Sequence, residues 1–575
     1  MADSRDPVET RVTRKQLIVA AGSGLAGLSL VGCGGSSAKL PDESVAVTGA
    51  ADAETTSTGG ASGAVSGTVP GPPSAGGRRG GRVINVFDEE GNSYDPAIGY
   101  STTGWEAISE LLFAALYAYG ADAAPQPNAA AAMPKITHAG TRYTIPLRTD
   151  VTFHNGRPVV ASDYIYAWER VLTPKLQSWA SSYISTIRGA KAMVAGKAKH
   201  LAGVRALDDH TLEVNLTQPD VTFLYALTQP FMAPVPREVV EQWGDRFTTH
   251  VVGNGPFKLK SYDSQGQRMV FERYDGYFWK GLPYLDEVEY RWGVDQGVQL
   301  LELRRGDVDI LGYGLNPQSL TKISGSPALK RFRFTQPLFA SRWLNLDKTR
   351  VASLKSREVR QALNWATDRD QLHRVMGDEA TAWGAPFPID LLGDARTFTP
   401  YGYDLDRAKA LMRQAGSPKV ELTFWVTIDP EPAIGQLLQQ QWNEIGVDVK
   451  LKQASVDAVN DLVLKNKTDA WISSYYAIYP TAIDLISQYW ETGGSANATD
   501  YSNPLVDRLT AKARRTPDET RRDALLARVE QAIGDDAAGV FIGNINWIMA
   551  RDPALENFHY SGVYGTYYDR LWVKA

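Results

Sequence analysis

The stretch Tyr143–Arg170, YTIPLRTDVTFHNGRPVVASDYIYAWER, changes its hydrophobic pattern several times along its length. From Tyr143 to Leu147, apolar positions alternate with polar ones or proline, which predicts a strand with one buried face. His154–Gly156 predicts a tight turn, because Asn and Gly tolerate positive φ. Apolar residues from Tyr164 to Leu172 recur at helical spacing, and Ser162 is expected to cap that helix.

Other segments alternate strands with helices. Alternating apolar residues at Val420–Val426, helical spacing from Ile434 to Ile445, and a second alternation at Val447–Leu451 predict a βαβ unit with parallel strands. A helix face is expected from Ile108 to Leu116. Thr516–Glu519 predicts a capping box that opens a further helix.

Composition narrows the function classes. The 575 residues are 43% hydrophobic and 22% charged, which is typical of a globular protein with more than one lobe. The formal net charge is −5 and no basic block is present, so nucleic acid is not expected as a partner. The single cysteine, Cys33, excludes an intrachain disulfide and a cysteine-based metal site.

The N-terminus predicts an export signal over residues 1–32. Basic residues precede the apolar run Leu17–Val31, which is shorter than the roughly 20 residues that a membrane span needs. Leu30–Cys33 resembles the bacterial lipobox, which implies cleavage before Cys33 and a diacylglycerol on its thiol; a free thiol in a plain signal peptide is the alternative. Residues 33–81 are rich in Gly, Ser, Ala and Pro and predict a disordered tether.

Several blocks resemble one family. The order Tyr-Thr-x-x-Leu-Arg-x-x-Val-x-Phe-His-x-Gly-x-Pro-x-x-Ala-x-Asp, starting at Tyr143, resembles the signature of the family 5 extracellular solute-binding proteins. These are the dipeptide, oligopeptide and nickel receptors of ABC importers. Val252–Leu259, Arg273–Asp286 and the helical segment Arg357–Met376 resemble further blocks of the same family, and the likeness extends over about 82–575.

The resemblance implies an α/β fold of the periplasmic-binding-protein type, with two lobes, a hinge and a ligand cleft between the lobes. The first lobe is expected to be enlarged and to comprise residues 82–312 and 541–575, with a subdomain at about 98–249. The second lobe is expected over residues 313–540.

Metal and catalytic sites are disfavoured. No two of the seven histidines have metal-binding spacing, and His154 is expected to be structural, so we predict neither a metal nor a cofactor. Gly22–Gly27 fits G-x-G-x-x-G but lies inside the signal run, where no βαβ unit can form around it. No G-x-S-x-G elbow is present, and we predict that the protein is not an enzyme.

The candidate ligand site rests on the resemblance. Thr468–Pro480, TDAWISSYYAIYP, resembles the strand and loop that line the family's cleft, where a peptide's main chain adds to the strand. Trp425, on an alternating strand, is expected in the core. The residues that the resemblance places at the ligand are Tyr475, Tyr476, Tyr479, Trp343, Trp383 and Trp471, with Tyr100, Thr102 and Thr103 on the opposing wall.

The loop departs from the family at one position. Tyr476 stands where the family has an Asp that neutralises the ligand's α-amine. A buried, unpaired ammonium group is costly, so a substitute carboxylate is needed. Either Asp469 or Asp484 supplies it, or the ligand is not a free-amine peptide; for Asp469 an ordinary surface role is favoured.

We therefore expect a monomeric, lipid-anchored substrate-binding protein on the extracytoplasmic face of a bacterial membrane, which captures oligopeptides and delivers them to an ABC permease. One alternative is a non-peptide ligand such as an oligosaccharide, a metallophore or another polar metabolite. The others are a surface hydrolase with paired carboxylates, and a sensor or chaperone without a permease. Sec and twin-arginine export both stay open.

Overall fold

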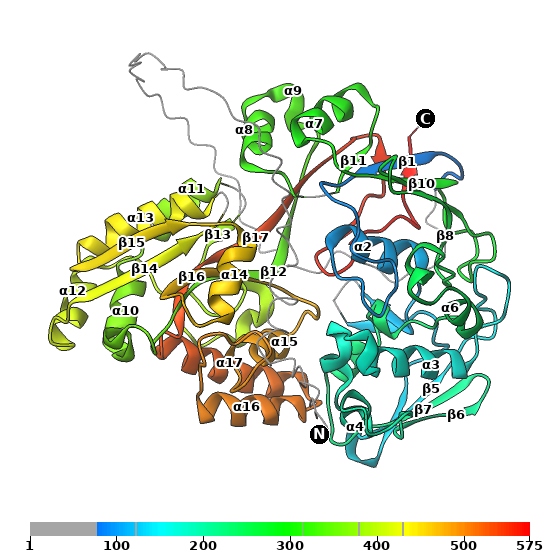
Figure 1. Ribbon diagram of the computed structural model, residues 1–575, viewed down its shortest axis with the longest axis horizontal. Helices are drawn as coiled ribbons and strands as arrows, with labels where there is room; N and C mark the ends of the chain where they lie inside the picture. The colour runs from blue at the N-terminus through cyan, green and yellow to red at the C-terminus, as the bar shows by residue number, and fades with distance from the viewer. Residues whose placement is uncertain (1–76, 121–123, 313, 378–379, 428–429, 575) are drawn as a thin grey trace, which may run out of the picture.

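The computed structural model describes residues 77–574, apart from 121–123, 313, 378–379 and 428–429. The expected signal, Cys33 and most of the expected tether therefore lie outside the described residues. Within the described part of the chain, no helix is long and apolar enough to span a membrane. The chain folds into two α/β lobes, which lie to the left and right of the long central strands in Figure 1.

One mixed sheet runs through both lobes. Its order is β15-β14-β16-β12-β17-β11-β1-β10-β9-β8, and β13 (Ala380–Ala382) pairs with β17. The bounds in this order are Val447–Gln453, Val420–Val426, Ala470–Tyr476, Arg333–Leu346, Gly539–Arg551, Ile310–Leu311, Arg82–Val86, Glu287–Arg291, Arg268–Arg273 and Phe257–Asp263.

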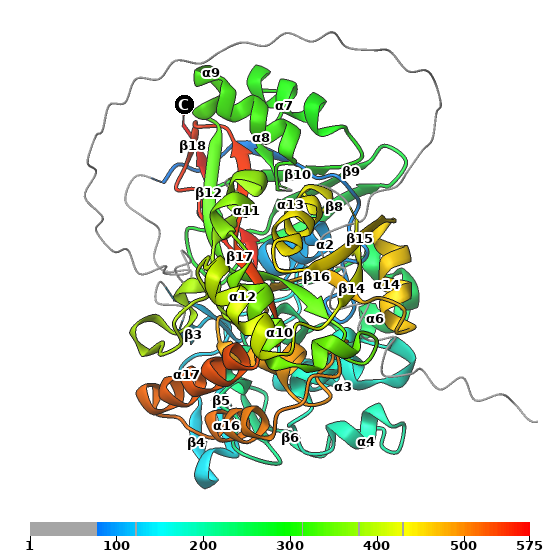
Figure 2. The ribbon, with the colours of Figure 1, turned by 90° about the vertical axis from the view of Figure 1, so that its left-hand side faces the viewer.

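The long antiparallel strands β12 and β17 connect the lobes. They pair from Arg333 with Ala550 to Asn345 with Gly539, and Figure 2 shows them running together along the molecule. Their register shifts between Pro337 and Ser341, so the ladder is interrupted part-way. Helix α8 (Pro317–Gly325) packs with α7 (Gln296–Arg305) beside the first lobe. We therefore propose that the lobes divide within β12 and β17.

Helices cover the sheet in both lobes. In the second lobe two apolar clusters form the core, one against β14, β15 and β17 and one beneath α16 and α17. The principal helices besides α7 and α8 are α3 (Ala161–Leu172), α6 (Arg237–Trp243), α10 (Arg357–Trp365), α11 (Arg369–Met376), α12 (Leu405–Gln414), α13 (Glu431–Asn443), α14 (Val456–Leu464), α16 (Pro504–Arg514) and α17 (Glu519–Asp535).

The expected βαβ unit is confirmed. β14 and β15 pair in parallel from Val420 with Val447 to Val426 with Gln453, and α13 connects them. Alternate residues of β14 are buried, as the sequence pattern predicts. Trp425 differs from the expectation, because it lies on the opposite face, half-buried, with the Lys452 ammonium 5.3 Å from its ring.

A second, antiparallel sheet belongs to the first lobe. Its order is β4-β5-β7-β6, with bounds Lys135–Thr137, Arg142–Pro146, Thr211–Asn215 and Val204–Asp208. Tyr143 and Ile145 of β5 are buried, which confirms the predicted strand. Helix α3 follows, as predicted, and buries Tyr164 and Trp168.

His154 joins the two most recognisable sequence blocks. Its Nδ1 accepts from the Gly253 N–H at 3.1 Å, and its Nε2 donates to the Gly255 carbonyl at 3.2 Å. A Cβ on Gly253 would lie 1.9 Å from the Leu112 carbonyl oxygen, so the backbone approach there requires glycine. These two backbone contacts agree with the structural role predicted for His154, and burial lowers its pKa to about 3.

Three predicted helix boundaries are wrong. α3 begins one residue before Ser162, and the Asp163 carboxylate accepts from the Val160 N–H instead. Helix α17 is capped by Asp518 rather than by Thr516. The helix expected to reach Leu116 ends at Leu112, because the Asn254 side chain bonds both the N–H and the carbonyl of Ala114.

Arg357–Met376 forms two helices instead of one. α10 ends at Trp365, and Asp368 caps α11 by accepting from the Gln371 N–H. A residue far away in the sequence stabilises this break, because the Asp368 N–H donates a hydrogen bond to the Gln441 side chain on α13.

Replacing His154 with Gln tests its structural role. Losing two backbone contacts is expected to lower the free energy of unfolding at pH 7 by about 2–3 kcal/mol. Because the folded state keeps this histidine neutral, its contribution is present above pH 6.5 and is lost as the pH falls toward 3. The deficit of His154→Gln should therefore narrow by about 2 kcal/mol between pH 7 and pH 5 in urea unfolding. His200→Gln, at an exposed site, is the matched control; a deficit that is constant with pH would contradict the assignment.

Candidate functional site

Strand β16 ends at the boundary between the lobes. It pairs antiparallel with β12 along its whole length, up to Ser341 with Tyr475 and Ala340 with Tyr476. Beyond the strand, the loop 477–480 leads to α15 (Ala482–Leu485). Tyr476 and Ile478 pack against the apolar core of the first lobe, so this end of β16 faces the other lobe.

Asp484 holds the loop 477–480 in place. Its Oδ2 accepts from the Tyr475 hydroxyl at 2.7 Å, from the Ile478 N–H at 3.0 Å and from the Tyr479 N–H at 3.4 Å. Its Oδ1 accepts from the Gln488 amide at 3.0 Å. Burial raises the pKa of Asp484 to about 6, although these donors counteract the effect. The carboxylate is thus engaged by its own loop.

Asp469 lies at the other end of β16. Its Oδ1 accepts from the Arg350 Nε at 2.8 Å, and its Oδ2 accepts from the Thr423 N–H at 2.9 Å. This ion pair lies at the beginning of β16, beside β14, inside the second lobe's part of the sheet. Both acidic residues that could substitute for the family's amine-binding Asp, Asp469 and Asp484, therefore already have protein partners in this structure.

Tyr479 crosses from the second lobe into the first. Its side chain is 4% exposed, and its ring lies 5.2 Å from Tyr183 and 6.3 Å from Tyr225, measured between centroids. Tyr183 belongs to η4 (Trp179–Ile184) and Tyr225 to α5 (Phe223–Ala226). Burial raises the pKa of Tyr183, and the negative charge of the nearby Asp484 carboxylate raises it further.

A backbone hydrogen bond forms a second contact between the lobes. The Val221 N–H donates to the Arg514 carbonyl at 2.9 Å, and the Arg514 guanidinium is paired with Glu491. The lobes therefore touch at the loop 477–480 and at α16. Sequence reasoning missed Tyr183, Tyr225 and Val221, because no local pattern marks them; the fold alone brings them to the boundary.

Two of the three tryptophans expected at the ligand lie inside the second lobe. Trp343 is 1% exposed, packs on Trp490 at 5.3 Å and donates to the Asn345 side chain, so its expected place at the cleft surface is corrected to the core. Trp471 is also buried. Trp383 is half-buried, donates to the Phe387 carbonyl and stacks under Arg396.

The opposing wall lies in the first lobe, at α2 (Thr102–Glu106). Tyr100 is 41% exposed on the loop before this helix, and Ser101 caps it. Thr102 is half-buried. Thr103 is buried, and its hydroxyl donates to the Glu89 carbonyl at 2.9 Å. Of these three, Tyr100 is the residue open to a ligand.

The arrangement of the site favours binding over chemistry. Among the described residues, no group of three or more His, Cys, Asp or Glu side chains is placed to hold a metal ion. The boundary between the lobes is built from tyrosine rings, a buried carboxylate and backbone groups. Aromatic faces with a few polar groups are typical of ligand-binding surfaces.

Comparison with known families decides the identity. The model of the bacterial extracellular solute-binding proteins, family 5, matches residues 124–497. The chain belongs to this family. The relatives of this chain include the dipeptide-binding protein DppE of Bacillus subtilis, 27% identical over 80% of this chain and 86% of that protein. The periplasmic oligopeptide-binding protein OppA of Salmonella typhimurium is 26% identical over 69% of this chain and 75% of that protein. Both relatives are named as peptide-binding proteins.

Solved structures of binding proteins share the fold. Clavulanic acid biosynthesis oligopeptide binding protein 2 superimposes with a TM-score of 0.79 at 21% identity, covering 90% of this chain and 99% of that one. DppA of Helicobacter pylori, in complex with the peptide STSA, gives a TM-score of 0.71 at 22% identity, covering 87% and 99%. The predicted family and fold class are thereby confirmed.

Replacing Asp484 with Asn tests the loop's anchor. The folded state holds this carboxyl at a pKa of about 6, against 3.8 ordinarily, so it binds the proton more tightly than the unfolded chain does. That contribution is complete below about pH 4 and is lost as the pH rises through 6. The stability of the wild type relative to Asp484→Asn should therefore fall by up to about 3 kcal/mol from pH 4 to pH 7.5 in urea unfolding.

Asp500→Asn, at an exposed position, is the control for this titration and should reproduce the wild-type pH profile. A wild-type stability that stays constant or rises relative to Asp484→Asn over that pH range would contradict the assignment.

Proposed function

We propose that this chain is the substrate-binding component of an ABC importer, and that it captures oligopeptides between its lobes and delivers them to a membrane permease. The observation that carries this proposal is a strand edge. β16 pairs with β14 only at Ala470 and Trp471, so in the described part of the chain Ile472–Tyr476 are paired on one side alone, by β12.

An edge of this kind suits a peptide ligand. An extended peptide can add to it as a further strand, using main-chain hydrogen bonds that do not depend on side-chain identity. The edge ends at Tyr476 and at the loop held by Asp484, where the second lobe meets the first. A ligand there would touch both lobes, which is what a ligand must do to favour the closed state. The names of the relatives, dipeptide- and oligopeptide-binding proteins, agree with this ligand class.

One observation favours a second candidate ligand class. Tyr476 stands where the family's amine-binding Asp is expected, and both Asp469 and Asp484 are engaged by protein groups. A free ammonium group at this end of the strand would lack a carboxylate partner from these residues. Ligands with a blocked amine, or polar ligands that are not peptides, fit this end of the site better.

The N-terminal sequence is the basis for a proposal about the location of the protein. We propose export through the signal in residues 1–32 and anchoring by a lipid on Cys33, with residues 33–81 as the tether between membrane and lobes. The family's extracellular location supports this assignment. We also propose that the protein acts as a monomer.

Binding of peptide pools tests the proposal. Pools of three to five residues, one with free and one with acetylated N-termini, are titrated into the purified protein by calorimetry and thermal unfolding. Saturating peptide, at about 100 times its dissociation constant, should stabilise the protein by about 2.7 kcal/mol. Tyr476→Ala should weaken binding about tenfold or more, and the exposed control Tyr403→Ala should not. Preference for the acetylated pool would support the blocked-amine ligand; no response to either pool would contradict peptide binding.

A further inference from the structure

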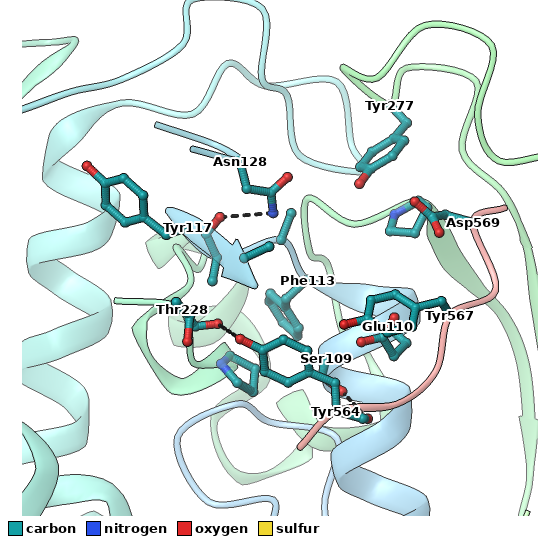
Figure 3. Close-up of a pocket in the computed structure, with 15 residues that line it drawn as sticks. Ser109, Glu110, Phe113, Tyr117, Asn128, Thr228, Tyr277, Tyr564, Tyr567 and Asp569 are labelled. Carbon is teal, nitrogen blue, oxygen red and sulfur yellow. Dashed lines mark hydrogen bonds between the residues drawn. The ribbon is translucent and has the colours of Figure 1, made fainter. Parts of the chain in front are cut away.

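A small cavity lies inside the first lobe, away from the strand edge of β16. It is bounded by the π-helical segment η1 (Ala107–Leu112), by the stretch that follows η1, and by the C-terminal segment after β20 (Gly565–Thr566). Its free volume is about 50 Å³, and a buried water needs about 10–15 Å³ on the same measure. Figure 3 shows the residues used below: Glu110, Tyr277, Tyr567 and Asp569.

Two carboxylates line this cavity. Asp569 is 4% exposed, and neither of its carboxylate oxygens has a side-chain hydrogen-bond partner in the described structure. Burial raises the pKa of Asp569, and the Arg570 charge and the backbone N–H groups of Arg570 and Asp569 oppose this rise. The Arg570 Nε lies 3.9 Å from its Oδ2, beyond hydrogen-bond reach. Glu110 is also buried, and its pKa is raised by burial and then by the charges of Asp569 and Glu106, while Arg570 opposes this rise. Burying such carboxylates without full compensation costs several kcal/mol.

Tyrosine hydroxyls complete the polar wall. The Tyr567 hydroxyl is buried and makes no hydrogen bond of full geometry in the described structure, and Figure 3 shows it directed toward Glu110. Burial and then the charge of Glu110 raise the pKa of Tyr567, and the Ser561 hydroxyl opposes this rise. Tyr277 also lines the cavity and is buried. Burial is the main cause of its raised pKa, and the charges of Asp569 and Glu110 raise that pKa further. An unpartnered hydroxyl beside two carboxylates is an incomplete polar cluster, because buried polar groups normally have partners.

We propose that this cavity is a cation site that takes a hard metal ion of the Ca²⁺ type, with the carboxylates of Glu110 and Asp569 as charged ligands. The Tyr567 hydroxyl and water molecules supply neutral oxygen ligands. The donors are those that Ca²⁺ prefers, and its irregular coordination by six to eight oxygens tolerates a site with two carboxylates. No His, Cys or Met lines the cavity, so the softer transition metals are not favoured.

The nearby carboxylate of Glu106 is not one of the proposed ligands. Glu106 accepts from the Tyr568 hydroxyl at 2.5 Å and from the Asn85 amide at 3.1 Å, so it is held by β1 and by the C-terminal segment. A bound ion would tie η1, through Glu110, to the C-terminal segment, through Tyr567 and Asp569. The site would thus fasten together the beginning and the end of the first lobe.

Terbium luminescence and calcium titration test the site. The purified protein is stripped with a chelator and titrated with Tb³⁺, whose emission is sensitised by nearby tyrosines, and separately with Ca²⁺ by calorimetry and thermal unfolding. We expect saturable binding and a higher unfolding temperature with Ca²⁺. Asp569→Asn and Glu110→Gln should each weaken binding at least tenfold, whereas Asp394→Asn, at an exposed site, should bind as the wild type does.

The metal-free proteins provide a second readout. Without metal, Asp569→Asn should unfold at the same temperature as the wild type or at a higher one, because it removes a buried negative charge that the Arg570 guanidinium, 3.9 Å away, compensates only in part. Absence of saturable Ca²⁺ and Tb³⁺ binding by the wild type would overturn the proposal. Binding that is unchanged in Glu110→Gln or Asp569→Asn would overturn it as well. If Asp569→Asn does not fold, Glu110→Gln and the wild-type titrations still decide.

Discussion

The carboxylate of Asp484 is the group on which the boundary between the lobes depends. Buried backbone N–H groups need hydrogen-bond partners, and in this loop Asp484 accepts from two of them and from the Tyr475 hydroxyl. The arrangement costs the desolvation of a negative charge, which the raised pKa reflects. In return, the end of β16 and Tyr479 are held in one geometry, with the Tyr479 ring set between Tyr183 and Tyr225 of the other lobe.

The rest of the fold places this loop opposite its partners. β12 and β17 pass between the lobes as one antiparallel pair, and we propose that relative motion of the lobes is absorbed where the register of this pair shifts, at Pro337/Ser341 and at Arg342/Trp343. In the first lobe, His154 and the glycines around Asn254 fix the end of η1 and the segment that leads to the second sheet. The strand edge and the loop thus belong to the second lobe and the opposing tyrosines to the first, and each lobe is stabilised by its own core.

Sequence reasoning worked where a local pattern decides the structure. The strand at Tyr143, the βαβ unit of β14, α13 and β15, and the role of His154 all follow from alternation, helical spacing or turn chemistry. It failed where a distant group decides. The helix expected to reach Leu116 is ended by Asn254, and the segment at 357–376 is divided with the help of Gln441.

The same distinction applies to the candidate site. The β16 loop could be placed from its resemblance to the family, but Tyr183 and Tyr225 come from irregular segments that no motif marks. Trp343 appeared to be a cleft residue because its segment resembles a cleft-lining one, yet its ring points into the second lobe's core. Glu110 and Asp569 are separated by most of the chain, and only the fold shows that they share a cavity.

We expect a ligand between the lobes to favour the arrangement in which they touch. Spin labels at Val194→Cys, at the end of α4 (Ala190–Val194), and at Lys512→Cys on α16 would report the separation of the lobes, in protein with Cys33 replaced by Ser. Pulsed electron–electron distance measurements should give a broad distribution without ligand, and a single narrow, short distance with a binding peptide. A distribution that does not change when calorimetry shows the ligand bound would contradict the account.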